Sequence, residues 1–169
     1  MLLLVSGAMT TMDDLAGTPG LGAFWTPATS NDLRRLDAWQ MPWGVDNGCF
    51  VLHQDKSQAR RRQVLDGFMR YVWSRHWDRP VPPAFIAVPD EVGNHEATLA
   101  AFQLGYGRLQ APDLPLAFVA QNGATPANLP WHLLSAVFIG GTPDEAGEEW
   151  KTGPQSAAII REAKRRGKW

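Results

Sequence analysis

Four short apolar runs in this chain each end abruptly in a cluster of polar or glycine residues, and this pattern limits the fold more than any other feature. The runs 43–45, 85–89, 116–120 and 136–139 lead into Asp46-Asn47-Gly48, Asp90-Glu91, Gln121-Asn122-Gly123 and Gly140-Gly141-Thr142, respectively. Strands of a parallel sheet buried on both faces read as continuous apolar runs. The ligand site of such a sheet lies at the carboxyl ends of its strands. The pattern therefore predicts a parallel sheet whose polar clusters share one site.

Segments with helical spacing alternate with these runs. Apolar residues recur at helical spacing between Gln58 and Trp73, and helices are also predicted over 95–104 and 156–166. We expect Gly105 and Gly107 to end the second of these. A short helix carrying Leu33 and Leu36 should follow the capping residues at 30–32. Strands are expected at 2–5, 41–45, 84–88, 115–120 and 136–139, a loop at 9–23 and a helical turn at 131–134.

This order of strands and helices predicts the fold class. Strands that alternate with helices over short connections are typical of α/β proteins with a parallel sheet. Right-handed crossovers between about five strands would curl the sheet. A complete eight-stranded barrel takes about 250 residues, with a lower limit near 200. With 169 residues, we expect one domain over 1–169 that resembles an incomplete TIM (β/α) barrel.

Composition excludes several classes of protein. The formal net charge is -1, so the whole molecule is not a general polyanion binder, although local basic patches can still bind nucleic acid. The single cysteine, Cys49, cannot build a disulfide framework or a cysteine zinc site, and we expect it to be a small buried apolar residue. We expect a cytoplasmic protein without a signal peptide, because the first apolar run is short and lacks a basic flank. No apolar run approaches the ~20 residues of a membrane helix.

The four clusters, in this order, resemble motifs of the tRNA-guanine transglycosylase superfamily. The likeness is closest to its phage and bacterial branch, which inserts 7-deazaguanine bases into DNA. The segments that carry it are Asp46-Asn47-Gly48-Cys49-Phe50, Val88-Pro89-Asp90-Glu91-Val92-Gly93, Val119-Ala120-Gln121-Asn122-Gly123 and Phe138-Ile139-Gly140-Gly141-Thr142. Trp150-Lys151 and the segment 161–169 are similar to the same branch. The cysteine-rich zinc site of the tRNA enzymes has no counterpart here.

The resemblance implies a role for each cluster. Asp46 would be a catalytic carboxylate, acting as general acid and base at the glycosidic bond. Asp90 would read the N–H groups of a guanine-like edge, and Gln121 would read the same purine. Gly140 and Gly141 would hold the base through backbone groups. In the family a later strand supplies a second Asp as nucleophile, and we expect that Asp to lie beyond Trp169, on a missing segment or on a neighbouring chain.

Each of these residues also has an ordinary structural alternative. Asp46 can be an Asx-type turn residue, and Asp90 can cap the helix that follows it. The amide of Gln121 can bond to neighbouring loop backbone, since buried polar groups find partners. Gly140-Gly141 can be a plain tight turn. Glu91 reads as a solvated loop or helix-start residue.

The histidines and the remaining charged residues give weaker indications of a functional site. His53 and His95 lack metal-ligand spacing and are expected to be ordinary loop or helix-start residues, so no metal is expected. The basic runs 60–62 and 164–166 can contact phosphates, but solvated helix faces explain such short runs as well. No phosphate-loop or dinucleotide fingerprint is present, and no cofactor is expected.

Three functions remain open from the sequence. The first is a glycosyltransferase of the pentosyltransferase type that exchanges guanine for a 7-deazaguanine derivative on nucleic acid, with DNA preferred over tRNA and the target base flipped out. The second is a nucleoside or glycoside hydrolase that uses Asp46 and Asp90 as a carboxylate pair. The third is a non-catalytic base- or nucleic-acid-binding subunit of a split enzyme. For any of these we expect a homo-oligomer or a second polypeptide to cover the open sheet edges, in a phage-infected or bacterial cell and away from membranes.

Overall fold

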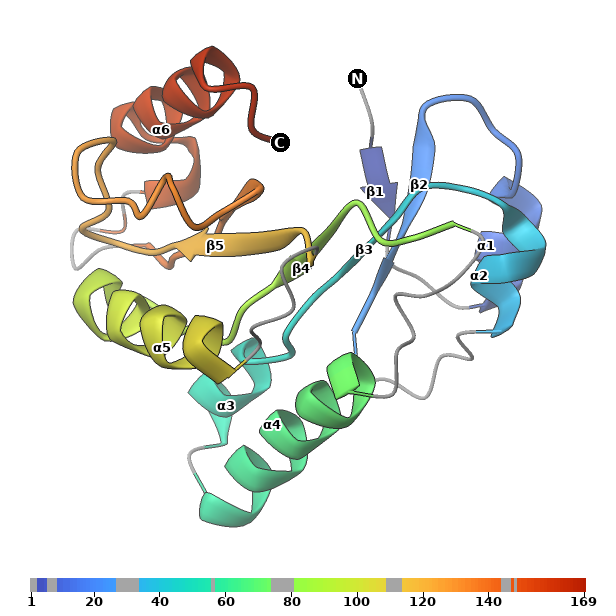
Figure 1. Ribbon diagram of the computed structural model, residues 1–169, viewed down its shortest axis with the longest axis horizontal. Coiled ribbons are helices and arrows are strands. Elements are labelled where there is room, and N and C mark those ends of the chain that lie inside the picture. The colour runs from blue at the N-terminus through green and yellow to red at the C-terminus, as the bar shows by residue number, and fades with distance from the viewer. Residues whose placement is uncertain are drawn as a thin grey trace. The chain divides into compact units, whose positions relative to one another are not determined.

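The computed structural model describes residues 3–5, 9–26, 34–55, 57–73, 81–108, 114–143, 147 and 149–169. Within these ranges, six strands alternate with helices along the chain (Figure 1). The chain divides into two compact units, Met1–Ile86 and Ala87–Trp169, and each is described by itself below. In Figure 1 the first unit runs from blue to green and the second from green to red.

The strands and helices of the first unit have the following bounds. The strands are β1 (Leu3–Val5), β2 (Leu21–Trp25), β3 (Trp43–Val45) and the first two residues of β4 (Phe85–Ala87), and the helices are α1 (Met9–Leu15), α2 (Arg34–Trp39), α3 (Phe50–Gln54) and α4 (Gln58–Trp73). The strand pairs β1·β2, β2·β3 and β3·β4 are all parallel.

The second unit continues the same alternation. It holds the end of β4, the strands β5 (Leu116–Ala120) and β6 (Ala136–Ile139), the helices α5 (His95–Arg108) and α6 (Pro154–Arg165), and the 3-10 turn η1 (Trp150–Thr152). The N–H of Val88 donates to Ala117 O at 3.0 Å, and β5 and β6 pair in parallel. Strand order therefore follows chain order from β1 to β6. This confirms the predicted class, an α/β fold with the strand order of an incomplete (β/α) barrel.

The core of the first unit forms around β3. All three residues of β3 are buried, and the Trp43 indole N–H donates to Val81 O at 2.7 Å. Gly44 lies so close to the Phe85 ring that a Cβ there would be 2.8 Å from it. Helix α4 buries Val64 and Phe68, four residues apart on one helix face. The predicted helix over 58–73 is therefore confirmed by its own apolar spacing.

The core of the second unit forms around β5, whose five residues are all buried. The Phe118 ring meets the rings of Phe102 at 5.2 Å and His95 at 5.8 Å, both edge-on. In Figure 1, β5 lies between α5 and α6. The inward side of α6 buries Ile159 and Ala163, while Ala158, which the sequence also places on that side, is only partly buried. This packing holds the carboxyl end of β5 in place.

The backbone of Trp169 lies alongside β6. Its N–H donates to Ser135 O at 3.2 Å, and the N–H of Val137 donates to Trp169 O at 2.9 Å. Two bonds from one residue to the neighbours of Ala136 are the pattern of a parallel strand pairing. The side chain of Trp169 is exposed.

Several sequence predictions were wrong in detail. The segment 9–23 is not a loop, because it contains α1 and most of β2, which raises the strand count from about five to six. Helix α3 was not predicted. Helix α5 runs through Gly105 and Gly107 to Arg108 instead of ending there. The proposed caps at 30–32 lie outside the described residues, as does Leu33, while α2 begins at Arg34.

Among the helices of the described part of the chain, none has the length and apolar character needed to cross a membrane.

Candidate functional site

In the second unit, the polar residues that follow β4 and β5 are in direct contact. The Gln121 amide donates from Nε2 to Asp90 Oδ2 at 2.5 Å, and Gln121 Oε1 accepts the N–H of Gly93 at 2.8 Å. Gln121 follows β5 directly and is 1% exposed, whereas Asp90 follows β4 and is half-buried. Two consecutive parallel strands therefore bring a carboxylate and an amide together at their carboxyl ends.

The glycine pair after β6 adjoins the same amide. A Cβ on Gly140 would lie 2.5 Å from Gln121 Nε2, so the Gly140 backbone packs directly against that group. Gly141 has a φ of +94°, a region that favours glycine, and a Cβ there would meet Asn122 Oδ1 at 2.8 Å. The Asn122 side chain both donates to Thr142 O, at 2.9 Å, and accepts from Thr142 N–H, at 3.0 Å. These two bonds fix the turn after β6 to the turn after β5.

Loop residues hold Asp90 in this position without using it as a helix cap. The residue that caps α5 is Asn94, whose Oδ1 accepts the N–H of Ala97 at 3.0 Å. Thr98 both accepts from the Glu91 N–H and donates to Glu91 O, each at 3.0 Å. The capping alternative for Asp90 is therefore wrong, since Asn94 fills that role. Glu91 is half-buried, and its backbone is anchored to Thr98 of α5.

The carboxylate of Asp46 lies in the first unit, directly after β3. Burial raises the pKa of Asp46, while hydrogen bonds from the backbone of Gly48 and Asn47 and from the Thr26 side chain oppose that rise. The contact with Gly48 N–H is an Asx-type turn bond, so that structural alternative is present. Asn47 makes a second bond of this type, since its Oδ1 accepts the Cys49 N–H at 2.7 Å. Cys49 is buried as predicted.

Three of the four sequence clusters thus come together in one unit. Asp90, Gln121 and Gly140 are linked by contacts, and Gly141 is tied to them through Asn122. Asp46 belongs to the other unit, Met1–Ile86. Its convergence with the other three stays a prediction.

A surface depression of about 510 Å³ beside the start of α5 was not predicted from the sequence. Its lining includes Asn94, Glu96, Asn122 and Asn128, together with His95. His95 is 5% exposed, and its two ring nitrogens make no well-formed hydrogen bond with the described residues, although the Asn128 backbone lies near enough to affect the pKa. Burial lowers the pKa of His95, while Glu96 and the Asn128 backbone raise it less. Nothing in the local sequence distinguishes this histidine, because its burial comes from Phe118 on β5.

The other sequence-predicted groups are placed as follows. The side chains of His53, Arg60 and Arg61 lie outside the described residues, whereas Arg62 is exposed on α4. The second basic run, 164–166, is exposed at the end of α6.

The chemistry available at this cluster is hydrogen bonding to a ligand with both donors and acceptors. A carboxylate accepts at about four positions, of which Gln121 takes one at Asp90. The Gln121 amide already accepts from the Gly93 backbone and donates to Asp90, so the alternative in which it bonds loop backbone is present, and it keeps one N–H donor beyond these two bonds. Next to them, Gly140 and Gly141 leave room for close backbone approach. Searches of protein-family models, curated proteins and solved structures found no match to this chain.

Proposed function

We propose that this chain binds a purine-type base at Asp90, Gln121 and Gly140 and takes part in exchanging guanine for a 7-deazaguanine derivative on nucleic acid. The observation that carries the proposal is the hydrogen-bonded pair of Asp90 and Gln121, packed against the Gly140 backbone. These residues lie 31 and 19 positions apart along the chain, so their contact comes from the fold. Their order in the chain is the one on which the resemblance to the transglycosylase superfamily depends.

The pair matches the polar edge of guanine. That edge presents two N–H donors beside a carbonyl oxygen, and a carboxylate is the side chain that accepts from both donors. An amide N–H can donate to the neighbouring carbonyl oxygen. A 7-deazaguanine keeps the same edge, because the replaced atom lies on the other ring. The cluster would therefore bind both the leaving and the entering base.

The reaction itself needs no net change of oxidation state. The glycosidic bond to N9 of guanine breaks, and a bond forms between the same sugar carbon and N9 of the incoming base. The proton that the incoming base loses from N9 balances the one that guanine gains. The resemblance to the transglycosylase superfamily assigns the proton transfer to Asp46, whose carboxyl pKa is raised by burial within its own unit.

DNA is the proposed nucleic acid, with the target base flipped out of the stack. The proposal includes a second polypeptide or a second copy of the chain. It is supported by large apolar side chains that are exposed in the structure, namely Phe50, Leu104, Ile160 and Trp169.

Two measurements on the purified chain test the proposal. Calorimetry with 7-deazaguanine measures base binding, and incorporation of radiolabelled guanine into duplex DNA, single-stranded DNA or tRNA measures exchange. Gln121→Ala should abolish base binding, whereas Gln103→Ala, on the exposed side of α5, should leave it unchanged. Binding without exchange would favour the base-binding subunit over the enzyme. Absence of binding in the unmodified chain, or equal binding by both variants, would contradict the proposal.

A further inference from the structure

The positive charge of this chain is concentrated in its last twenty residues. From Trp150 to Trp169 the sequence has six lysines and arginines and one glutamate, whereas the rest has ten and sixteen acidic residues. The net charge of this segment is therefore +5 and that of the remainder -6. The net charge of the whole chain is close to zero, although its positive and negative charges are separated along the sequence.

Helix α6 presents much of this charge on one exposed stripe. Arg161, Lys164 and Arg165 follow the spacing i, i+3, i+4, so they share a helix face, and all three are exposed. The buried side of the helix carries Ser156, Ile159 and Ala163. One or two cations in the last turn would satisfy the helix dipole. The six lysines and arginines in this segment are more than the helix dipole requires.

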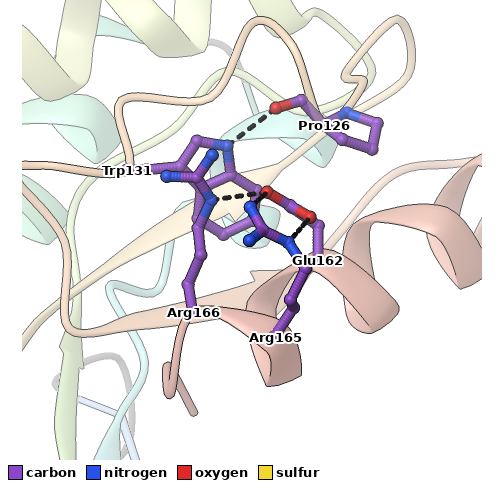
Figure 2. Close-up of polar contacts among 5 residues, drawn as sticks. All are labelled: Pro126, Trp131, Glu162, Arg165 and Arg166. Atoms are coloured by element: carbon purple, nitrogen blue, oxygen red, sulfur yellow. Dashed lines mark hydrogen bonds and ion pairs between the residues drawn. The ribbon is translucent and has the colours of Figure 1, made fainter.

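Two arginines at the end of α6 are held in defined positions (Figure 2). Glu162 accepts from Nε and Nη2 of Arg165, at 2.7 and 2.6 Å, and from Nε of Arg166 at 2.6 Å. The guanidinium of Arg166 also lies over the Trp131 ring, with Cζ 5.1 Å from the ring centroid. Trp131 in turn donates from its indole N–H to Pro126 O at 2.7 Å. The Arg166 side chain is therefore fixed between a carboxylate and an aromatic ring.

These bonds leave donors for a ligand. Nη1 of Arg165 and both terminal nitrogens of Arg166 make no hydrogen bond to the described part of the chain. Guanidinium groups that are already positioned lose less conformational freedom when they bind, and their fork of N–H groups suits phosphate oxygens. Arg161 and Lys164 add two further charges about one helical turn apart.

We infer that the exposed stripe of α6, with Arg166 beside it, binds the phosphate backbone of nucleic acid. Charge complementarity carries the inference, and the choice of nucleic acid over other polyanions rests on the proposed function. The surface would supply sequence-independent affinity, while the Asp90–Gln121 cluster would recognise the base. The two contacts lie in the same unit but use different residues.

A matched pair of double variants tests this surface. Arg161→Gln with Lys164→Gln removes two charges from the stripe, and Arg62→Gln with Arg70→Gln removes two exposed charges from α4. Fluorescence anisotropy with a labelled 20-base-pair duplex, at several salt concentrations, gives the affinity and its salt slope. The α6 variant should bind on the order of tenfold more weakly at low salt, with a slope smaller by about 1.8, since each phosphate contact contributes about 0.9. The α4 variant should stay within about twofold.

Equal losses of DNA affinity in the two double variants, or no loss of DNA affinity in the α6 variant, would overturn the inference. So would binding of phosphatidylserine vesicles through α6 without binding of DNA. Far-ultraviolet circular dichroism checks that the variants keep their helices. The Gln121→Ala variant separates this inference from the proposed function, because it should lose base binding and keep its DNA affinity and salt slope. Base binding without DNA binding would reject the α6 surface alone, and DNA binding without base binding would reject the proposed function alone.

Discussion

The amide of Gln121 donates to the carboxylate of Asp90 at 2.5 Å, although the two residues lie 31 positions apart on separate strand ends. Because Gln121 also accepts the Gly93 N–H, its amide ties the loop after β4 to the end of β5. The same residue that we propose as a base reader therefore also stabilises the site. Substitutions of Gln121 should therefore change both the stability of the fold and base binding, so stability and binding must be measured separately.

Gln121→Glu should destabilise the protein in a pH-dependent way. A second carboxylate 1% exposed beside Asp90 raises the pKa of the pair, because two such charges cannot both ionise at close range. The folded state then holds a proton that the unfolded state releases. The free energy of unfolding should therefore be lower by about 2–4 kcal/mol at pH 7, and this loss should shrink as the pH falls toward 5. Urea unfolding at both pH values measures it, and an equal cost at both would contradict this account.

Gly140→Ala should disturb the site through a steric clash. The added Cβ would lie 2.5 Å from Gln121 Nε2 and 2.8 Å from Val119 Cγ1. We expect a loss of about 1–3 kcal/mol in the free energy of unfolding, with weaker base binding. Gly17→Ala is the control for base binding, since a Cβ there has no atom within 4 Å, while its φ of +78° makes alanine strained and so lowers stability without touching the cluster. Full base affinity in Gly140→Ala would show that Gln121 does not contact the base.

His95 should make the stability of the protein depend on pH. Burial lowers its pKa, so its folded-state value lies below the ordinary value of 6.5. The unfolded state then binds the proton more readily, and stability is full above about pH 6.5 and falls as the pH drops through and below that value. His95→Phe keeps a ring against Phe118 and should remove this part of the pH dependence. Thermal unfolding of the unmodified protein and of His95→Phe from pH 8 to 5.5 measures this dependence. If the unfolding temperatures of the two proteins fall in parallel as the pH drops, His95 is not the group responsible.

Asp46→Asn should separate catalysis from binding. The substitution keeps the shape of the side chain and removes its proton-transfer function, so exchange should fall by about 10²- to 10⁴-fold. Base affinity should change little, because we assign base reading to Asp90 and Gln121. Asn relieves the buried charge but keeps a single oxygen for the hydrogen bonds from Gly48, Asn47 and Thr26, so its two effects on stability oppose each other. Unchanged exchange activity would reject Asp46 as the acid and base.

The association state of the chain is the last prediction. β1 is the first strand in the order and β6, beside which the Trp169 backbone pairs, is the last. Large apolar side chains are also exposed on helices, such as Leu104 on α5 and Ile160 on α6. We expect light scattering to give a dimer or larger particle, or association with a second polypeptide. A monodisperse monomer with full exchange activity would contradict this expectation.

The sequence by itself determined those elements whose pattern is local. Helix α4 begins at Gln58 and ends at Trp73 as predicted, because its apolar residues repeat at helical spacing. Strands β5 and β6 were predicted to within a residue, since wholly apolar runs bounded by glycine and polar residues are typical of buried parallel strands. The polar clusters followed from the same runs, and so did their position at strand ends.

Only the tertiary structure decided what depends on distant neighbours. Strand β2 was predicted as loop from its glycines, yet Gly22 is required there because a Cβ would lie 2.4 Å from Pro42 O and 2.6 Å from the Leu4 side chain. The burial of His95 against Phe118 and the contact of Gln121 with Asp90 likewise join residues from separate elements. Local periodicity reports which face of an element is apolar, but not which atoms will occupy the space beside it. That space is set by the packing of strands and helices far apart in the chain.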